Sequence, residues 1–139
     1  HSTALAADDA AVGSVVAESG IIVAATSAAT PVLDGSWVAD GACVVAMGSH
    51  EPDRRELDAE LIGRSLVVVE DVGTALREAG EFVMAIAEGA LAPEALHPMK
   101  ALVTGDVTRA ADRPNVFKSV GMAWEDLVIA DGVVTAGQP

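Results

Sequence analysis

Residues 42–61 read ACVVAMGSHEPDRRELDAEL, and this stretch decides the fold class. The apolar run at 42–47 has the length of a buried strand, a short polar turn follows it, and a helix is expected over 54–62. Asp53 is a suitable N-cap for that helix, because Glu56 lies three residues later as in a capping box. A strand, a turn and a helix in this order form the unit of an open α/β sheet, which binds ligands beyond the carboxyl ends of its strands.

Two other apolar runs have the same character. Residues 21–25 and 66–69 are continuously apolar rather than alternating, which is typical of strands covered on both faces in a parallel sheet. Helices are expected over 6–18, where Gly20 ends the helix, and over 72–79. This alternation of strands and helices predicts an α/β fold with a largely parallel sheet and flanking helices.

The carboxy-terminal part of the chain differs in pattern. A short helix is expected around Phe82, and short helical pieces over 90–102, which contains two prolines. A polar loop is expected over 105–113, a last strand over 115–121 and a closing helix over 122–135. The side chains expected on the apolar side of that closing helix are Trp124, Leu127, Val128 and Val134.

Composition limits the class of protein. The chain has 139 residues, 51% of them hydrophobic, as is typical of one folded globular domain. A net charge of -13 argues against nucleic acid as a partner, because phosphates bind to basic patches. No apolar run approaches the roughly 18 residues of a membrane span, and no signal-peptide pattern opens the chain, so we expect a cytoplasmic protein without membrane contact. The single cysteine, Cys43, is expected to be a buried thiol, and the scattered histidines predict no metal site.

The turn after the strand at 42–47 gathers the residues most able to do chemistry. Gly48 lets a ligand approach the backbone closely, and His50 belongs to the residue type that titrates near neutral pH. The helix that follows is expected to offer free N–H groups to an anion. The same residues also fit a solvated turn with a helix cap, so the pattern alone leaves both interpretations open.

Two familiar motifs are absent from the sequence. There is no G-x-G-x-x-G turn between a strand and a helix, so a dinucleotide-binding domain containing this chain would contain it as its second half. There is also no G-x-S-x-G elbow, so a serine hydrolase is not indicated.

Three stretches, taken together and in order, narrow the interpretation. They read ATSAATPVL at 25–33, GSHEPDRREL at 48–57, and FKSVG with EDL within 117–127. REAG and AEG lie between the second and third stretches, as expected from the same pattern. The ordered set resembles the ornithine cyclodeaminase/mu-crystallin family, and the resemblance runs from about residue 20 to residue 127.

The resemblance implies a subunit of two parts, a Rossmann domain that binds NAD or NADP and a substrate and dimerisation domain. Residues 1–114 would form the second half of the Rossmann domain, and residues 115–139 would return to the substrate and dimerisation domain. A homodimer is implied. The glycine-rich first half of the family pattern is not in this sequence, so the chain resembles a carboxy-terminal portion and is expected to be inactive by itself.

The resemblance also assigns roles to single positions. His50 and Arg54 correspond to catalytic positions, and no metal ligand is implied. The positions that would bind the cofactor are Thr26, Ser27, Met47, Gly48 and Ser119.

His50 departs from the family's ornithine cyclodeaminases, which have an Asp there. The resemblance therefore implies hydride transfer on a small amino or cyclic imino acid, by a ketimine or pyrroline-2-carboxylate reductase, an alanine dehydrogenase-like enzyme or an ornithine cyclodeaminase. The alternatives are a non-catalytic ligand-binding protein of the mu-crystallin kind and an inactive fragment.

Overall fold

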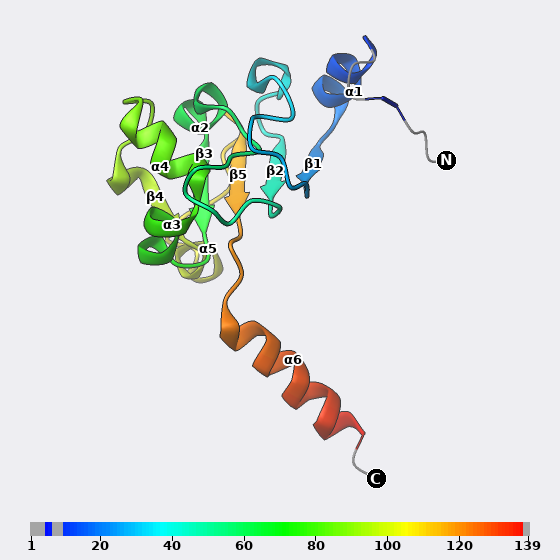
Figure 1. Ribbon diagram of the computed structural model, residues 1–139, viewed down its shortest axis with the longest axis vertical. Coiled ribbons are helices and arrows are strands. Elements are labelled where there is room, and N and C mark those ends of the chain that lie inside the picture. The colour runs from blue at the N-terminus through cyan, green and yellow to red at the C-terminus, as the bar shows by residue number, and fades with distance from the viewer. Residues whose placement is uncertain (1–4, 7–9, 138–139) are drawn as a thin grey trace.

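The computed structural model describes residues 5–6 and 10–137, and its centre is a parallel β-sheet (Figure 1). The sheet has five strands in the order β1-β2-β5-β3-β4, and every neighbouring pair is parallel. The strands are β1 (Ile21–Ala24), β2 (Cys43–Ala46), β3 (Leu66–Val69), β4 (Leu96–Pro98) and β5 (Asn115–Lys118). The predicted α/β fold with a parallel sheet is confirmed.

The helices between β2 and β4 pack on one face of the sheet, and the helix after β4 lies beside the other face. The α-helices are α1 (Val12–Glu18), α2 (Ala59–Arg64), α3 (Val72–Glu78), α4 (Gly80–Ala87), α5 (Met99–Thr104) and α6 (Ala123–Ala136). Two short 3-10 helices are η1 (Gly35–Trp37) and η2 (Pro93–Ala95). The expected helix over 6–18 extends across residues 7–9, which lie outside the described residues, and its described part begins at Val12.

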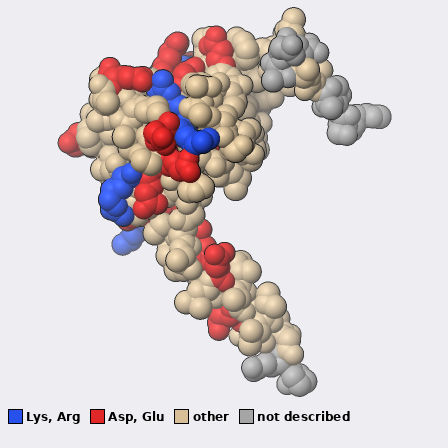
Figure 2. Space-filling model, viewed as in Figure 1, with Lys and Arg blue, Asp and Glu red and all other residues tan. Residues whose placement is uncertain are grey.

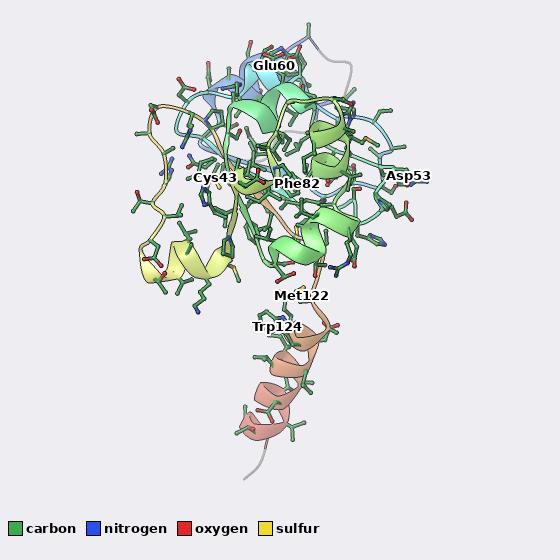
Figure 3. The ribbon with its side chains drawn as sticks, turned by 90° about the vertical axis from the view of Figure 1, so that its left-hand side faces the viewer. Cys43, Asp53, Glu60, Phe82, Met122 and Trp124 are labelled. Carbon is green, nitrogen blue, oxygen red and sulfur yellow. The ribbon has the colours of Figure 1, made fainter. Side chains whose placement is uncertain are left out.

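The core lies between the sheet and helices α2, α3 and α4. The register aligns Val44 of β2 with Val116 of β5, and Val116 with Val67 of β3, so these side chains share one face. All three are buried, and Phe82 of α4 packs over that face with no exposed surface (Figure 3). This apolar layer holds the strand ends, and therefore the loops that follow them, in fixed positions.

The opposite face of the sheet is more open. Ile21 and Val23 on β1 are 73% and 60% exposed. Cys43, expected to be buried, is only half-buried, and it lines an apolar cavity of about 320 Å³ beside α5. The prediction of a buried thiol is therefore wrong, because the helices among the described residues leave this part of β2 open to the cavity.

The helix after the polar turn begins later than expected. The interpretation of Asp53 and Glu56 as a capping box for a helix over 54–62 is wrong, because α2 begins at Ala59. Its N-cap is Asp58, whose Oδ1 accepts a hydrogen bond from Leu61 N at 2.8 Å, while Asp53 lies on the outer surface (Figure 3).

Asp58→Ala is expected to lower the free energy of unfolding by about 1–2 kcal/mol, because it removes the cap of α2. Asp58 Oδ2 also accepts a hydrogen bond from Gly35 N at 2.7 Å, so the variant loosens η1 as well. Asp53→Ala is the matched control and should change stability by less than about 0.5 kcal/mol. Urea unfolding measures both, and equal losses in the two variants would contradict the observed start of α2.

The predictions for residues 90–102 and 122–135 are only partly confirmed. Helical pieces do form in the first region, but the pattern missed β4, a three-residue strand that pairs with β3. The closing helix is confirmed as α6, yet it extends away from the sheet and none of its side chains is buried (Figure 1). Its exposed apolar side chains are Trp124, Leu127, Val128, Ile129, Val133 and Val134.

Candidate functional site

The site lies where three neighbouring strands end. Strands β1, β2 and β5 are adjacent and parallel, so the residues that follow them emerge at one edge of the sheet. Backbone hydrogen bonds continue the ladder beyond the strands, from Met47 N to Ala24 O at 2.9 Å and from Ser119 N to Ala46 O at 3.0 Å. The loops after the three strands are therefore held side by side at the edge where open α/β sheets bind their ligands.

A pocket of about 280 Å³ opens between the loops that follow β1 and β2. Four of the predicted site residues meet there although they come from two loops. Glycine, alanine and serine dominate the lining, so the backbone is accessible to a ligand. The lining residues are Ser27, Ala28, Gly48, Ser49, His50, Glu51 and Arg54.

Arg54 connects the two loops across this pocket. Its Nη1 donates a hydrogen bond to Ser27 O at 3.1 Å, and its Nε lies 2.5 Å from Glu51 Oε2. The side chains of Arg54 and Glu51 are 44% and 50% exposed, and an exposed ion pair of this kind contributes at most about 1 kcal/mol. An anionic ligand is therefore able to replace Glu51 as the partner of Arg54 at small cost.

The other predicted site residues, Thr26, Met47 and Ser119, do not line the pocket. Thr26 Oγ1 donates to Glu56 Oε1 at 2.8 Å, and Met47, at the end of β2, is 55% exposed. Ser119 Oγ donates to Glu70 Oε1 at 2.6 Å, so Glu70 holds the serine at the end of β5.

The expectation that a helix N-terminus offers its N–H groups to an anion at this turn is wrong. The chain after Glu51 forms a hydrogen-bonded turn, with Arg54 N donating to Glu51 O at 3.2 Å, and α2 starts only at Ala59. The positive charge that the turn offers to an anion is therefore that of the Arg54 side chain, which lines the pocket beside His50.

Glu56 is a residue of the site that sequence reasoning misplaced. Its side chain is fully buried, and Oε1 accepts hydrogen bonds from Thr26 N at 2.5 Å and from Thr26 Oγ1. Its Oε2 accepts from Gly48 N at 2.8 Å and from Ser49 N at 3.4 Å. These contacts with Thr26 and Gly48 were not predicted, because the capping-box pattern predicted that the Glu56 carboxylate would cap the helix that follows it.

The environment of Glu56 determines its charge. Burial disfavours the ionised carboxylate, but hydrogen bonds from Thr26 and Gly48 and the nearby Lys118 outweigh burial, so the pKa of Glu56 is lowered from its ordinary 4.5. The folded protein thus keeps this group charged at lower pH than the unfolded chain does. Glu56 therefore stabilises the fold above pH 4.5 and loses that contribution as the pH falls through its lowered pKa.

This linkage predicts the pH dependence of Glu56→Gln. The loss in free energy of unfolding caused by the substitution should be largest near neutral pH and should shrink as the pH falls below 4.5. Urea titrations of both proteins across that range measure the difference, and a loss independent of pH would contradict an ionised Glu56.

Two more buried charges lie beneath the same turn. Lys118 at the end of β5 and Glu81 in the first turn of α4 both have fully buried side chains, with Lys118 Nζ 3.4 Å from Glu81 Oε2. Lys118 Nζ also donates to Ser49 O, and Glu81 Oε1 accepts from Glu56 N at 2.9 Å. The turn that carries His50 is thus supported from the core by an ion network.

The described residues limit two other classes of function. Within residues 5–6 and 10–137, no group of three or more His, Cys, Asp or Glu side chains is placed to hold a metal ion. No helix in the same part of the chain has the length and apolar character needed to cross a membrane.

Comparisons with known proteins agree on one family. Residues 6–136 match the sequence model of the ornithine cyclodeaminase/mu-crystallin family. The chain is 36% identical over 110 residues to ketimine reductase mu-crystallin of Rattus norvegicus, covering 79% of this chain and 33% of the relative.

Solved structures share the fold. Delta(1)-pyrroline-2-carboxylate reductase of Thermococcus litoralis, determined with NADH and L-proline, superposes with a TM-score of 0.80 and 29% identity over 86% of this chain and 38% of its own. An archaeal alanine dehydrogenase dimer with bound NAD gives a TM-score of 0.73 and 26% identity, over 81% of this chain and 36% of its own.

These matches cover most of this chain but a much smaller share of each relative. The chain spans between 33% and 38% of the length of these relatives, whereas the family match covers almost all of the chain. With a parallel Rossmann-type sheet and the ordered strand-end loops, this chain belongs to the ornithine cyclodeaminase/mu-crystallin family.

Proposed function

We propose that the complete protein containing this sequence is an NAD(P)-dependent oxidoreductase that transfers a hydride at the α-carbon of a small amino or cyclic imino acid. The observation that carries the proposal is the pocket between the loops after β1 and β2, where Ser27, Gly48, His50 and Arg54 meet. Support comes from relatives whose names describe ketimine and pyrroline-2-carboxylate reduction, and from a structure with NADH and L-proline.

The residues at the pocket fit the nicotinamide end of such a cofactor. The pocket has a volume of about 280 Å³, and the small side chains of Ser27 and Ala28 leave the backbone open beside it. Met47 offers an exposed apolar surface at the end of β2. Ser119 Oγ donates a hydrogen bond to Glu70 Oε1 and accepts one from Gly121 N at 3.3 Å, which leaves one lone pair able to accept from an amide. When bound, the nicotinamide supplies or accepts the hydride.

His50 suits the proton transfer that accompanies the hydride. Reduction of a C=N bond places the hydride on carbon and requires a proton on nitrogen, and imidazole exchanges protons near neutral pH. Arg54 provides positive charge beside it for a substrate carboxylate. Because the ornithine cyclodeaminases have Asp where this chain has His50, we place imine reduction and amino-acid oxidation ahead of ornithine cyclisation.

The test is turnover by the complete protein. NADH or NADPH is mixed with pyrroline-2-carboxylate, and loss of the absorbance of the reduced cofactor is expected. Alanine, proline and ornithine are offered with the oxidised cofactor to distinguish the possible substrates. Cofactor binding without turnover of any of these compounds would support a non-catalytic ligand-binding protein and contradict the proposal.

His50→Ala in the complete protein is expected to lower kcat by about 10²–10⁴-fold, because it removes the general acid and base. His97→Gln, on β4 at the far edge of the sheet, is the control and should retain kcat. A wild-type kcat in the His50 variant would remove His50 from the chemistry.

We also propose that residues 1–114 belong to the cofactor domain together with β5, which lies in the same sheet, and that the chain beyond β5 returns to a substrate and dimerisation domain. The apolar side chains of α6 surround the helix rather than forming one stripe, which is typical of a helix covered on several sides. On the face in Figure 2, the basic side chains lie on the body and none lies on α6. The archaeal alanine dehydrogenase is a dimer, and sedimentation of the complete protein as two protomers is expected.

A further inference from the structure

The Glu56 side chain holds both loops of the pocket by their backbone N–H groups. Each carboxylate oxygen of Glu56 bonds one of the two loops. Oε1 accepts from Thr26 N at 2.5 Å and from Thr26 Oγ1 in the loop after β1. Oε2 accepts from Gly48 N at 2.8 Å and from Ser49 N in the loop after β2. Four donors on one buried carboxylate satisfy all of its usual acceptor directions. The distance between the two loops is therefore set by the width of a single carboxylate group.

The two loops also touch directly. A Cβ on Gly48 would lie 2.0 Å from Thr26 O and 2.3 Å from Thr26 N, so the backbones of the two loops are packed against each other. Neither loop is able to shift toward the other, and Glu56 prevents them from separating. Their positions are coupled.

The third loop joins the same network through Lys118. Its Nζ donates to Ser49 O in the second loop and lies 3.4 Å from Glu81 Oε2, and Glu81 Oε1 accepts from Glu56 N. Lys118 immediately precedes Ser119 in the chain. The charges that face Glu56 from its neighbouring elements are thus Lys118 on β5 and Glu81 on α4, both fully buried.

We infer that Glu56 is a positioning residue of the reaction site: its carboxylate holds the Thr26 and Gly48 loops at the separation that the nicotinamide and substrate require. The inference rests on the proposed function. Glu56 touches neither reacting group and acts through the backbone of Thr26 and Gly48, whereas Lys118 and Glu81 hold the carboxylate and the turn in place.

Glu56→Gln in the complete protein tests whether Glu56 affects kcat and NADH binding beyond its effect on the stability of the fold. Glutamine has one carbonyl oxygen, so one of the two loops must face an NH2 donor instead of an acceptor. Since a misplacement of about 1 Å costs up to about 10²-fold, we expect kcat to fall by about 10- to 100-fold and NADH to bind more weakly. Both quantities are measured well below the melting temperature of every variant.

Asp58→Asn is the matched control, because it alters a carboxylate that also joins two segments, accepting from Leu61 N and from Gly35 N, but bonds neither Thr26 nor Gly48. Its kcat should remain close to that of the wild type. Equal kcat values and NADH affinities in the two variants, after correction for the folded fraction, would overturn the inference. If Glu56→Gln does not fold, Glu56→Asp, whose shorter carboxylate reaches only one loop, replaces it with the same expected direction.

Amide hydrogen exchange distinguishes failure of this inference from failure of the proposed function. In Glu56→Gln, exchange at the Thr26 or Gly48 amide should accelerate, and in Asp58→Asn it should not, whether or not the wild-type protein turns over an imino acid. A wild-type protein without turnover would refute the proposed function alone. Unchanged exchange at both amides in Glu56→Gln would refute the positioning role.

Discussion

Gly48→Ala is expected to destabilise the fold by about 3 kcal/mol and to abolish NAD(P)H binding by the complete protein. The added Cβ would lie 2.0 Å from Thr26 O, 2.3 Å from Thr26 N and 2.5 Å from Glu56 Oε1. Two of these atoms belong to the backbone of a loop that Glu56 holds by two hydrogen bonds, so no side-chain rotation relieves the clash. The loops must separate, and the pocket between them is lost. Urea unfolding and NADH fluorescence titration measure the two effects.

Gly132→Ala is the control for the loss of a glycine as such. No atom lies within 4 Å of a Cβ at this position in α6, and alanine is favoured over glycine inside a helix by about 1 kcal/mol. This variant should be as stable as the wild type or more so. If Gly48→Ala kept both stability and NADH affinity, the two loops would not be in contact as described.

Lys118→Met is expected to lower the free energy of unfolding by about 3–5 kcal/mol, because it leaves buried carboxylates without a counter-ion. Glu56 and Glu81 both have no exposed surface, and Lys118 is the cation beside them. The substitution also removes the donor to Ser49 O, so the turn that carries His50 loses its support from β5. Urea unfolding at neutral pH measures the loss.

A second substitution shows whether charge causes this loss. Glu81→Gln added to Lys118→Met removes one of the two buried negative charges, so the double variant should recover part of the stability lost in the single variant. Lys100→Met, at an exposed position of α5, should change stability by less than about 0.5 kcal/mol. Additive losses in the double variant would show that packing, rather than charge, determines the contribution of Lys118.

The strands and their direction were predictable because residues 43–46 and 66–69 are apolar at every position, as is typical of strands in a parallel sheet. The open face of β2 was not predictable from this pattern, because β3 is buried at all four positions whereas β2 is buried only at alternate ones. β4 escaped detection because three residues between a 3-10 helix and an α-helix carry too little periodicity. The family resemblance supplied the candidate residues His50 and Arg54, whose roles remain predictions.

The start of α2 was predicted wrongly from a local pattern. Asp53 and Asp58 are both capping residue types, and the spacing from Asp53 to Glu56 matched a capping box. The tertiary contacts of Glu56 with Thr26 and Gly48 determine where α2 begins. They hold the carboxylate in the core and keep residues 54–58 out of the helix. A local pattern contains no information about a partner 30 residues away.

The ion network beneath the site was equally hidden. Lys118 and Glu81 meet because β5, the last strand in the chain, inserts between β2 and β3. From the sequence alone, a lysine at the end of an apolar strand and a glutamate at the start of a helix are both expected to lie on the surface. Strand order cannot be read from apolar runs alone, and the burial of these charges follows from that order.

Transfer of deuterium tests the central claim most directly. The complete protein is incubated with pyrroline-2-carboxylate and NAD(P)H that carries deuterium at the reactive carbon of the nicotinamide, and the product is examined by mass spectrometry. A hydride-transferring site at the ends of β1, β2 and β5 predicts proline labelled at its α-carbon, and Glu56→Gln should slow the appearance of the label. Unlabelled proline, or no product from any of the amino and imino acids named above, would contradict the account.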